Sequence, residues 1–451
     1  MNSSDDVLSK LQTARYVDFF YNDLSCVIRG KRYPAGQAEK VLQNGMMIPG
    51  GSFLLAVNGE CMDPEGMGFS DGDPDEVGAV IPHTVTPTTW SRYPTAHGMI
   101  TLNSLDGVPY YYEPRNVLSR VLNRFIDTGL TPVVAFELEF YLLDIKRQSD
   151  GGIRAPSSPL TGQITEATQV YNLDDLEDFS EFFDDIMTAC EAQGIQTGAI
   201  SSEYAPGQFE INLQHSSDIL RAADHCVMFK RTVQGVARKH GMQATFMAKP
   251  YPEHSGSGLH LHISMLDEDG GNAFDGGGEY STPECGSELL YQAIGGVLHS
   301  MDEFMGVLAP SVNSYKRFVP NIYVPVSKSW AYENRSVALR IPKSPGKARR
   351  IEHRIAGADA NPYLTAAAIL AGIHNGIANR MDCPPPAIGN AGEQLDPQLP
   401  FDAALAFDRS RAGRTVNSYF GENYVRAYTS CKQLELDAFH NSKAADSDWY
   451  V

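Results

Sequence analysis

This 451-residue sequence has no long hydrophobic run and no segment with the pattern of a secretion signal. No stretch of 18 or more apolar residues would span a bilayer, and the N-terminal segment MNSSDDVLSKLQ lacks an apolar core behind a basic stretch. Positive charge is scarce, because 36 Lys and Arg face 55 Asp and Glu for a formal charge of −19. We therefore expect a soluble, cytoplasmic protein that binds neither nucleic acid nor a membrane surface.

Paired cysteines and the common phosphate-binding loops are missing as well. The seven cysteines are odd in number and include no CxxC pair, which favours free thiols in a reducing compartment over disulfides or a zinc framework. The chain has no GxxxxGK[ST] loop and no useful GxGxxG. Any phosphate binding is therefore predicted to be of neither P-loop nor Rossmann type.

Hydrophobic periodicity predicts an α+β protein with two parts. A mainly β segment, residues 1–108, precedes a region, residues 109–451, that alternates strands and helices without a regular βαβ rhythm. The pattern predicts two strands around the Asn22-Asp23 turn, a strand over 131–143 and a hairpin over 196–214. It also predicts helices over residues 1–14, 34–44, 114–129, 174–194, 216–241, 286–309, 360–380 and 401–439.

The segment GSGLHLHIS places polar and apolar residues in strict alternation. His260, His262 and Ser264 are two residues apart, so on a strand they share one face. The preceding GSG, residues 256–258, lets the backbone approach a ligand closely. The pattern fits a metal or catalytic site, although an ordinary half-exposed strand would also carry it.

Four glutamates offer oxygen ligands for a cation. Glu137 and Glu139 lie two apart in an apolar strand, about 7 Å along it, and buried carboxylates so close repel unless a cation lies between them. The turn at 206–207 allows Glu203 and Glu210 to stand on paired strands. With His260, these residues form a set that favours magnesium or manganese over zinc.

The run SPGKARRIEHR, residues 344–354, concentrates positive charge. Its cations surround Glu352, and the apolar residues Ile351 and Ile355 indicate a strand with Arg350, Glu352 and Arg354 on one face. Basic groups in that arrangement suit phosphate oxygens. A solvated charge run is the alternative.

Six motifs together resemble those of the glutamine synthetase family in order and spacing: AFELEF, EYAPGQFE, GSGLHLH, NSYKRFVP, ENRSVALRIP and KARRIEHR…ANPYL. The resemblance spans nearly the whole chain. It implies a small N-terminal β-grasp-like domain and a large catalytic domain, an antiparallel sheet with flanking helices. It also implies ATP as co-substrate and two or more Mg²⁺ (or Mn²⁺) ions, with phosphoryl transfer to the glutamate side chain before an amine attacks.

The resemblance also implies residue roles. The first ion would be held by Glu139, Glu203 and Glu210, and the second by Glu137, His260 and Glu352. L-Glutamate and the transferring phosphoryl group would be bound by Arg317, Arg335 and Arg354, with Gly256 touching the glutamate. ATP would be surrounded by His262, Ser264, Arg340, Lys347 and Arg350. The catalytic set would be Glu203, Arg317 and Arg335.

Three departures from the family pattern concern the amine. Tyr323 stands where ammonia-using enzymes carry a flap glutamate, the loop GGSF at 50–53 lacks their aspartate, and Ser255 replaces an asparagine. Fewer acids and more apolar surface suit a primary organic amine. The segment FLLAVNGE…DGDPD resembles the γ-glutamylpolyamine synthetase branch, and we hypothesise that Tyr204, Tyr323 and Trp330 line an amine pocket and that Glu203 accepts the amine proton.

The family assembles as six-membered rings, so a hexamer or dodecamer is expected, with active sites shared between neighbouring subunits. In regulated bacterial glutamine synthetases, a loop in this part of the chain holds a tyrosine that is adenylylated. Residues 383–400 of this sequence contain no tyrosine, so no such control is expected. Two alternatives are an ammonia-using glutamine synthetase and a catalytically inactive structural relative. The latter predicts loss of metal ligands, yet all six are present. The residues leave open whether the acceptor is a diamine, a polyamine, ethanolamine or another monoamine.

Overall fold

The computed structural model describes residues 7, 11, 13–149, 151–164, 170–442, 445, 446 and 449. The helix predicted over residues 1–14 lies almost wholly outside them. No helix of the described residues is long and apolar enough to cross a bilayer.

The N-terminal part is a six-stranded sheet in the order β2-β1-β6-β4-β3, with β5 paired to β6. Alternation along β1 sends Val17, Phe19 and Tyr21 into a small core. β1 pairs antiparallel with β2 and parallel with β6. The elements are β1 Tyr16–Asn22, β2 Ile28–Pro34, α2 Ala35–Asn44, β3 Met46–Pro49, β4 Asp75–Val80, β5 Thr86–Pro87 and β6 Thr95–Asn103.

The second part is built on an eight-stranded sheet in the order β12-β13-β14-β11-β7-β9-β8, with β10 paired to β7. Its pairs are antiparallel except β12 with β13. The strands are β7 Thr131–Asp144, β8 Thr197–Ser202, β9 Gln208–Leu213, β10 Met242–Thr245, β11 Leu259–Leu266, β12 Trp330–Tyr332, β13 Leu339–Ile341 and β14 Ile351–His353. The predicted strand over 131–143 and hairpin over 196–214 are confirmed.

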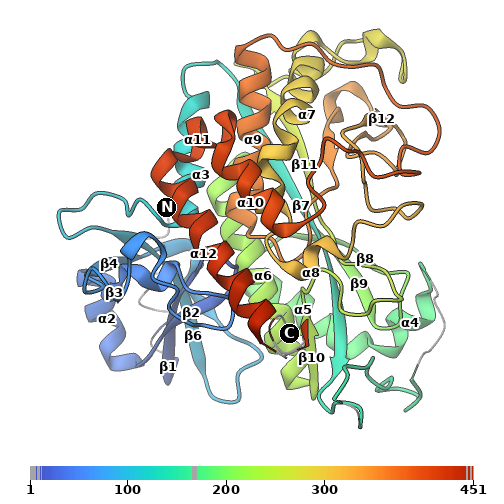
Figure 1. The fold of residues 1–451 in the computed structure, drawn as a ribbon. Helices are drawn as coiled ribbons and strands as arrows, with labels where there is room; N and C mark the ends of the chain where they lie inside the picture. The colour runs from blue at the N-terminus through green and yellow to red at the C-terminus, as the bar shows by residue number, and fades with distance from the viewer. Residues whose placement is uncertain are drawn as a thin grey trace.

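Helices flank this sheet, and Figure 1 shows α7 and α9 beside each other on one side of it. A Cβ on Gly296 of α7 would lie 2.2 Å from the Gly372 carbonyl of α9, so glycine permits this close packing. The helices are α3 Pro114–Leu122, α4 Leu173–Asp178, α5 Ser180–Ala192, α6 Ile219–Lys239, α7 Glu288–Leu308, α8 Val312–Tyr315, α9 Pro362–Ala378, α10 Ala403–Ala412, α11 Arg414–Phe420 and α12 Glu422–Asn441.

The predicted single helix over 174–194 is divided between α4 and α5. Phe179 leaves helical geometry with φ −115°, and its ring packs edge-on against Phe209, 5.5 Å between centroids. Tertiary packing of this aromatic ring accompanies the break, which helical periodicity does not reveal.

The two parts meet along α6 and α12. The Val57 N–H donates to Glu435 of α12 at 2.7 Å, and Lys432 Nζ donates to Ser25 Oγ at 2.8 Å. The predicted α+β class, with an antiparallel sheet and flanking helices, is confirmed. The division at residue 108 lies between β6 and α3 and stays a prediction.

Candidate active site

The register of β7 with its two neighbours creates one polar face. Glu137 is paired with His260 of β11, and Glu139 with Glu210 of β9. Residues directly opposite each other in antiparallel strands share a face. Glu137 and Glu139 are two residues apart on β7, so the imidazole of β11 and the acids of β7 and β9 share one face across three strands.

β14 and β13 continue this face toward positive charge. His262 of β11 lies opposite Glu352 of β14, which in turn lies opposite Arg340 of β13. Arg340 donates to Glu352 at 2.7 Å, and Arg354 also donates to Glu352. The carboxylate of Glu352 is thus held by two guanidiniums.

The opposite face of these strands is the hydrophobic core. Phe136 and Leu138 of β7 and Leu261 and Ile263 of β11 are buried. A one-residue slip of either strand would exchange these side chains with the acids and imidazoles. Burial of the core therefore fixes which residues face the site.

Two of the carboxylates have a lowered pKa because histidine or arginine side chains contact them. Burial would raise the pKa of Glu137, but hydrogen bonds from His260 at 2.7 Å and His262 at 3.2 Å hold it well below its usual value. Burial opposes ionisation of Glu352 too, yet Arg354 and the two histidines lower its pKa to about 2. These groups carry charge at neutral pH.

Two other carboxylates, those of Glu203 and Glu210, form no ion pair with a cation of the described residues. Burial, followed by the charges of Glu139 and Glu137, raises the pKa of Glu203 to about 8. Burial and the same neighbours raise the pKa of Glu210 to about 10. A divalent cation would remove this repulsion.

Two groups of side chains have their ligand atoms within 4.8 Å of one another. They are Glu137 with His262 and Glu352, and Glu137 with Glu210 and His260. The carboxylate-rich donor set with its unneutralised acids fits a divalent ion. Glu137 is common to both groups, whereas the sequence assigned it to one ion and placed His262 with ATP.

Glu139 and Glu203 belong to neither group. A Glu139 oxygen accepts from the Gly258 N–H at 2.8 Å, which draws it toward the GSG loop. Glu203 still lies within electrostatic reach of Glu137 and Glu139. The structure thus brings all six predicted ligands to one region, and their division between two ions stays a prediction.

The guanidinium of Arg317 lies against the GSG loop, residues 256–258, apart from the acidic groups. Arg317 is 2% exposed and donates to the Ile355 carbonyl at 3.0 Å, and no carboxylate of the described chain lies within 4.0 Å of its nitrogens. A Cβ at Gly256 would lie 2.6 Å from Arg317 Cγ, so only glycine fits. Arg335 is exposed, and its charge acts on Glu203.

A cavity of about 480 Å³ adjoins the acids on the other side. Four residues that the family resemblance assigned to ATP line it, namely His262, Ser264, Lys347 and Arg350, and binding of ATP there stays a prediction. Arg350 Nε donates to His262 Nδ1 at 3.2 Å. Arg340 is engaged instead with Glu352 and Glu333.

The structure brings together two of the three aromatic residues that were hypothesised to line an amine pocket, and the pocket itself stays a prediction. The rings of Tyr204 and Tyr323 lie 5.7 Å apart, and Tyr204 directly follows Glu203. The hypothesis is wrong for Trp330, which is 3% exposed and donates to the Pro384 carbonyl at 2.7 Å. Its ring packs on Tyr291 and Tyr332, since pairing of β12 with β13 turns it into the core.

Sequence reasoning missed three residues beside the site. Gln208 Nε2 reaches both Glu139 and the Gly256 carbonyl, at 3.4 and 3.1 Å. Asn212 lies opposite Glu137. The alternation Gln208, Glu210, Asn212 along β9 could have revealed both. Tyr171, whose charge environment includes Glu203 and Arg335, had no such signal.

Comparison with known proteins supplies the family. Residues 111–450 match the glutamine synthetase catalytic domain. A γ-glutamylputrescine synthetase of Escherichia coli is 40% identical over 96% of this chain and 90% of its own length. A glutamate–isopropylamine ligase of a Pseudomonas species is 32% identical over 92% and 90%, and a γ-glutamylethanolamide synthetase of Streptomyces coelicolor is 31% identical over 95% and 90%.

A solved structure of GmaS in complex with ADP superposes with a TM-score of 0.82 at 26% identity, covering 98% of both chains. The matched fold, the carboxylate–histidine face and the adjoining cationic cavity agree with one another. This chain belongs to the glutamine synthetase family.

Proposed function

We propose that this protein transfers the γ-phosphoryl group of ATP to the side-chain carboxylate of L-glutamate and then joins that carbon to a primary organic amine. The prediction of an ATP-dependent glutamate–amine ligase is confirmed, since the relatives above act, by name, on putrescine, isopropylamine or ethanolamine. Enzymes of this family use ATP and divalent metal ions. The 40% identity to the γ-glutamylputrescine synthetase supports a diamine as the first acceptor to test.

The residues of the acidic face would hold two Mg²⁺ or Mn²⁺ ions. Glu137 would contribute to both ions, with His262 and Glu352 at one and Glu210 and His260 at the other. When bound, such ions neutralise the negative charge on ATP as its terminal phosphoryl group leaves. Glu139 and Glu203 would complete the set through their remaining oxygen atoms.

The cationic residues have distinct tasks in this proposal. Arg317 is buried, and its side chain makes one hydrogen bond among the described residues and meets no carboxylate of theirs within 4.0 Å. It is therefore available to bind a substrate carboxylate. Arg354 is already fixed by Glu352 and would orient the transferring phosphoryl group. Arg335, exposed at the edge, would close on the same group. Lys347 and Arg350 would bind the phosphates of ATP from the adjoining cavity.

The paired rings of Tyr204 and Tyr323 carry the proposal of an organic acceptor. Their centroids lie 5.7 Å apart, and both rings are partly exposed. An ammonium group is attracted to aromatic faces, and its carbon chain packs on them. Glu203, adjacent in sequence to Tyr204, would draw the ammonium inward and accept its proton before attack.

Amine-dependent release of ADP tests this function. The assay compares ammonia with putrescine, ethanolamine and isopropylamine in the presence of ATP, glutamate and Mg²⁺. Strong stimulation by an organic amine and little by ammonia supports the proposal. Stimulation by ammonia alone would identify an ammonia-using glutamine synthetase, and none by any amine would favour an inactive relative.

Two substitutions of Tyr323 distinguish the effect of its aromatic ring from the effect of an added negative charge. Tyr323→Glu is expected to raise the rate with ammonia relative to the organic amine, because it returns an acid to the flap. Tyr323→Phe keeps the ring and serves as the matched control, so its preference should stay near that of the parent. Equal amine preference in all three proteins would contradict a role for Tyr323 in acceptor choice.

We also propose assembly into six-membered rings, hexamer or dodecamer, with sites shared between subunits. The family resemblance supports this assembly, with the loop that carries the short helix Gly50–Phe53 reaching the next subunit's site. Native mass spectrometry measures the state directly. A chain that is active as a monomer would refute shared sites.

A further inference from the structure

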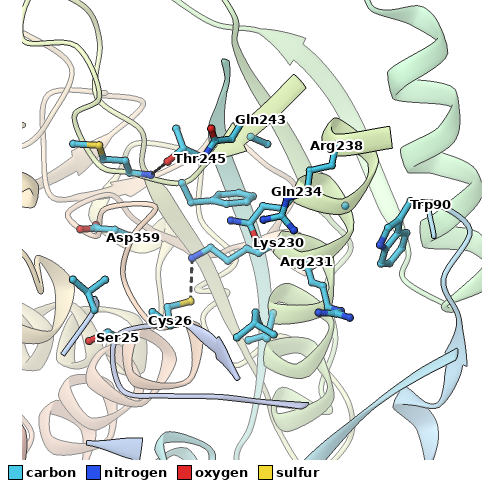
Figure 2. Close-up of a pocket in the computed structure, with 18 of the residues that line it drawn as sticks. Ser25, Cys26, Trp90, Lys230, Arg231, Gln234, Arg238, Gln243, Thr245 and Asp359 are labelled. Atoms are coloured by element: carbon cyan, nitrogen blue, oxygen red, sulfur yellow. Dashed lines mark hydrogen bonds between the residues drawn. The ribbon is translucent and has the colours of Figure 1, made fainter. Parts of the chain in front are cut away.

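A second cavity, of about 790 Å³, lies where the N-terminal sheet meets α6 (Figure 2). Its wall comes from β1, the β1–β2 loop, α6 and the segment that follows β10. None of the residues predicted for the active site lines it. Its volume lies in the range of small-molecule sites.

One face of α6 carries polar side chains into this cavity. Lys230, Gln234 and Arg238 are four residues apart, so they lie on successive turns of one helix face. Figure 2 shows the three side chains on the same side of α6, with Lys230 reaching Cys26 of the β1–β2 loop. Trp90 and Phe246 add aromatic surface to the wall.

Lys230 is a buried cation without a matching anion. It is 6% exposed, and its Nζ lies 3.2 Å from Cys26 Sγ and 3.5 Å from the Ala360 carbonyl. The ring of Phe246 is 5.1 Å away, and no carboxylate of the described residues lies within 4.0 Å. Burying an ammonium group in this way is costly unless an anion compensates it.

The cavity as a whole carries excess positive charge. The cations that line it are Arg32, Arg92, Lys230, Arg231, Arg238, Lys239 and Lys432, and the lining carboxylates are Asp18 and Asp359. The ion pairs that neutralise some of them are Asp18 with Arg32 and Arg231, Asp185 with Lys239, and Glu435 with Lys432. Lys230, Arg92 and Arg238 have no carboxylate partner among the described residues, in a chain whose net charge is −19.

We propose that this cavity binds a small oxyanion metabolite, bearing phosphate or carboxylate groups, on Lys230 and Arg238. Charge-assisted hydrogen bonds from an ammonium and a guanidinium suit either kind of oxygen. Gln234 supplies an amide beside them, and Phe246, whose ring lies 5.1 Å from Lys230 Nζ, accommodates an apolar or ring portion. Asp359 lies on the opposite wall (Figure 2), so the anion sits toward α6.

Asp359 connects this cavity with the active site. One of its oxygens accepts from Ser311 at 2.8 Å and from Ser314 at 2.6 Å, and its charge acts on Arg317. The segment after β10 lines the cavity at Phe246 and Met247 and continues into the loop that contains Gly256. A bound anion is therefore expected to change the KM for glutamate more than kcat.

Calorimetric titration of the full chain tests binding without turnover. Tripolyphosphate and citrate are the two probes, used with a chelator so that no metal ion draws them to the acidic face. One site per chain is expected for at least one probe, and the probe that binds identifies phosphate or carboxylate chemistry. Lys230→Met and Arg238→Ala should each weaken binding about tenfold.

Two matched variants control for general charge loss. Lys40→Met removes an exposed cation on α2, away from the cavity, and Lys347→Met removes one from the predicted ATP cavity. Both should bind the probe as the parent does. The proposal is overturned if neither probe binds, if Lys230→Met and Arg238→Ala leave the affinity unchanged, or if Lys347→Met weakens it as much as they do.

Discussion

Mg²⁺ binding to the metal-free protein is expected to release protons at pH 7. The pKa of Glu203 is about 8 and that of Glu210 about 10, through burial and the charges of Glu137 and Glu139. At pH 7 both carboxyls are therefore mainly protonated. A divalent ion binds the ionised forms, so about two protons per chain should leave as the sites fill.

The sign of the pH dependence follows from this competition. Protons and metal ions bind the same oxygens, so the apparent metal affinity should rise with pH and level off only above the pKa of Glu210. Between pH 7 and 8 the rise should approach two orders of magnitude for two displaced protons, and about one order for a single proton.

Calorimetry in two buffers of different ionisation enthalpy measures the proton number, as the slope of observed heat against buffer enthalpy. Glu210→Gln should lower that number by about one, because the amide carries no titrating proton. Glu253→Gln, whose side chain is exposed, should leave it unchanged. Release of fewer than about half a proton by the parent would refute the assignment of Glu203 and Glu210 to the metal sites.

Further predictions concern the GSG loop, the hydrophobic core and the stability of the metal-free protein. Gly256→Ala should raise the KM for glutamate about tenfold or more, because the added Cβ would lie 2.6 Å from Arg317 Cγ. Steady-state kinetics measure this change in KM. Phe136→Ala should cost about 3–5 kcal/mol in urea unfolding, because the ring is 1% exposed. The raised pKa values of Glu203 and Glu210 destabilise the metal-free fold as pH rises from about 4.5 toward 10, so its Tm should fall between pH 6 and 9 and recover with Mg²⁺ in thermal unfolding.

Local periodicity predicted which side chains share a face. Glu137 with Glu139, and His260 with His262, follow from an alternation of two that any strand imposes. The order of the strands does not follow from it, because β7 and β11 are separated by more than a hundred residues and their register depends on the core. For this reason the sequence could not show that Glu137 faces both imidazoles.

The sequence also could not show which aromatic residues are buried and which are exposed. Trp330 and Tyr323 lie in one stretch without helical periodicity, and composition gives no reason to separate them. In the structure β12 pairs with β13 and turns Trp330 inward, whereas Tyr323 is 58% exposed beside Tyr204. Tertiary pairing, which residue type alone does not encode, decides which ring can meet a ligand.

The sheet thus carries a gradient of charge from β13 to β9. Arg340 and Arg354 hold Glu352 ionised at one side, whereas Glu210 at the other side has acids as its nearest charged neighbours and stays protonated until a cation arrives. In the proposed reaction, the guanidiniums of the first side would stabilise the anionic phosphoryl group. Glu137, the carboxylate between these sides, is common to both ligand groups, and a cation beside Glu210 would supply the positive charge that the protein itself provides at Glu352.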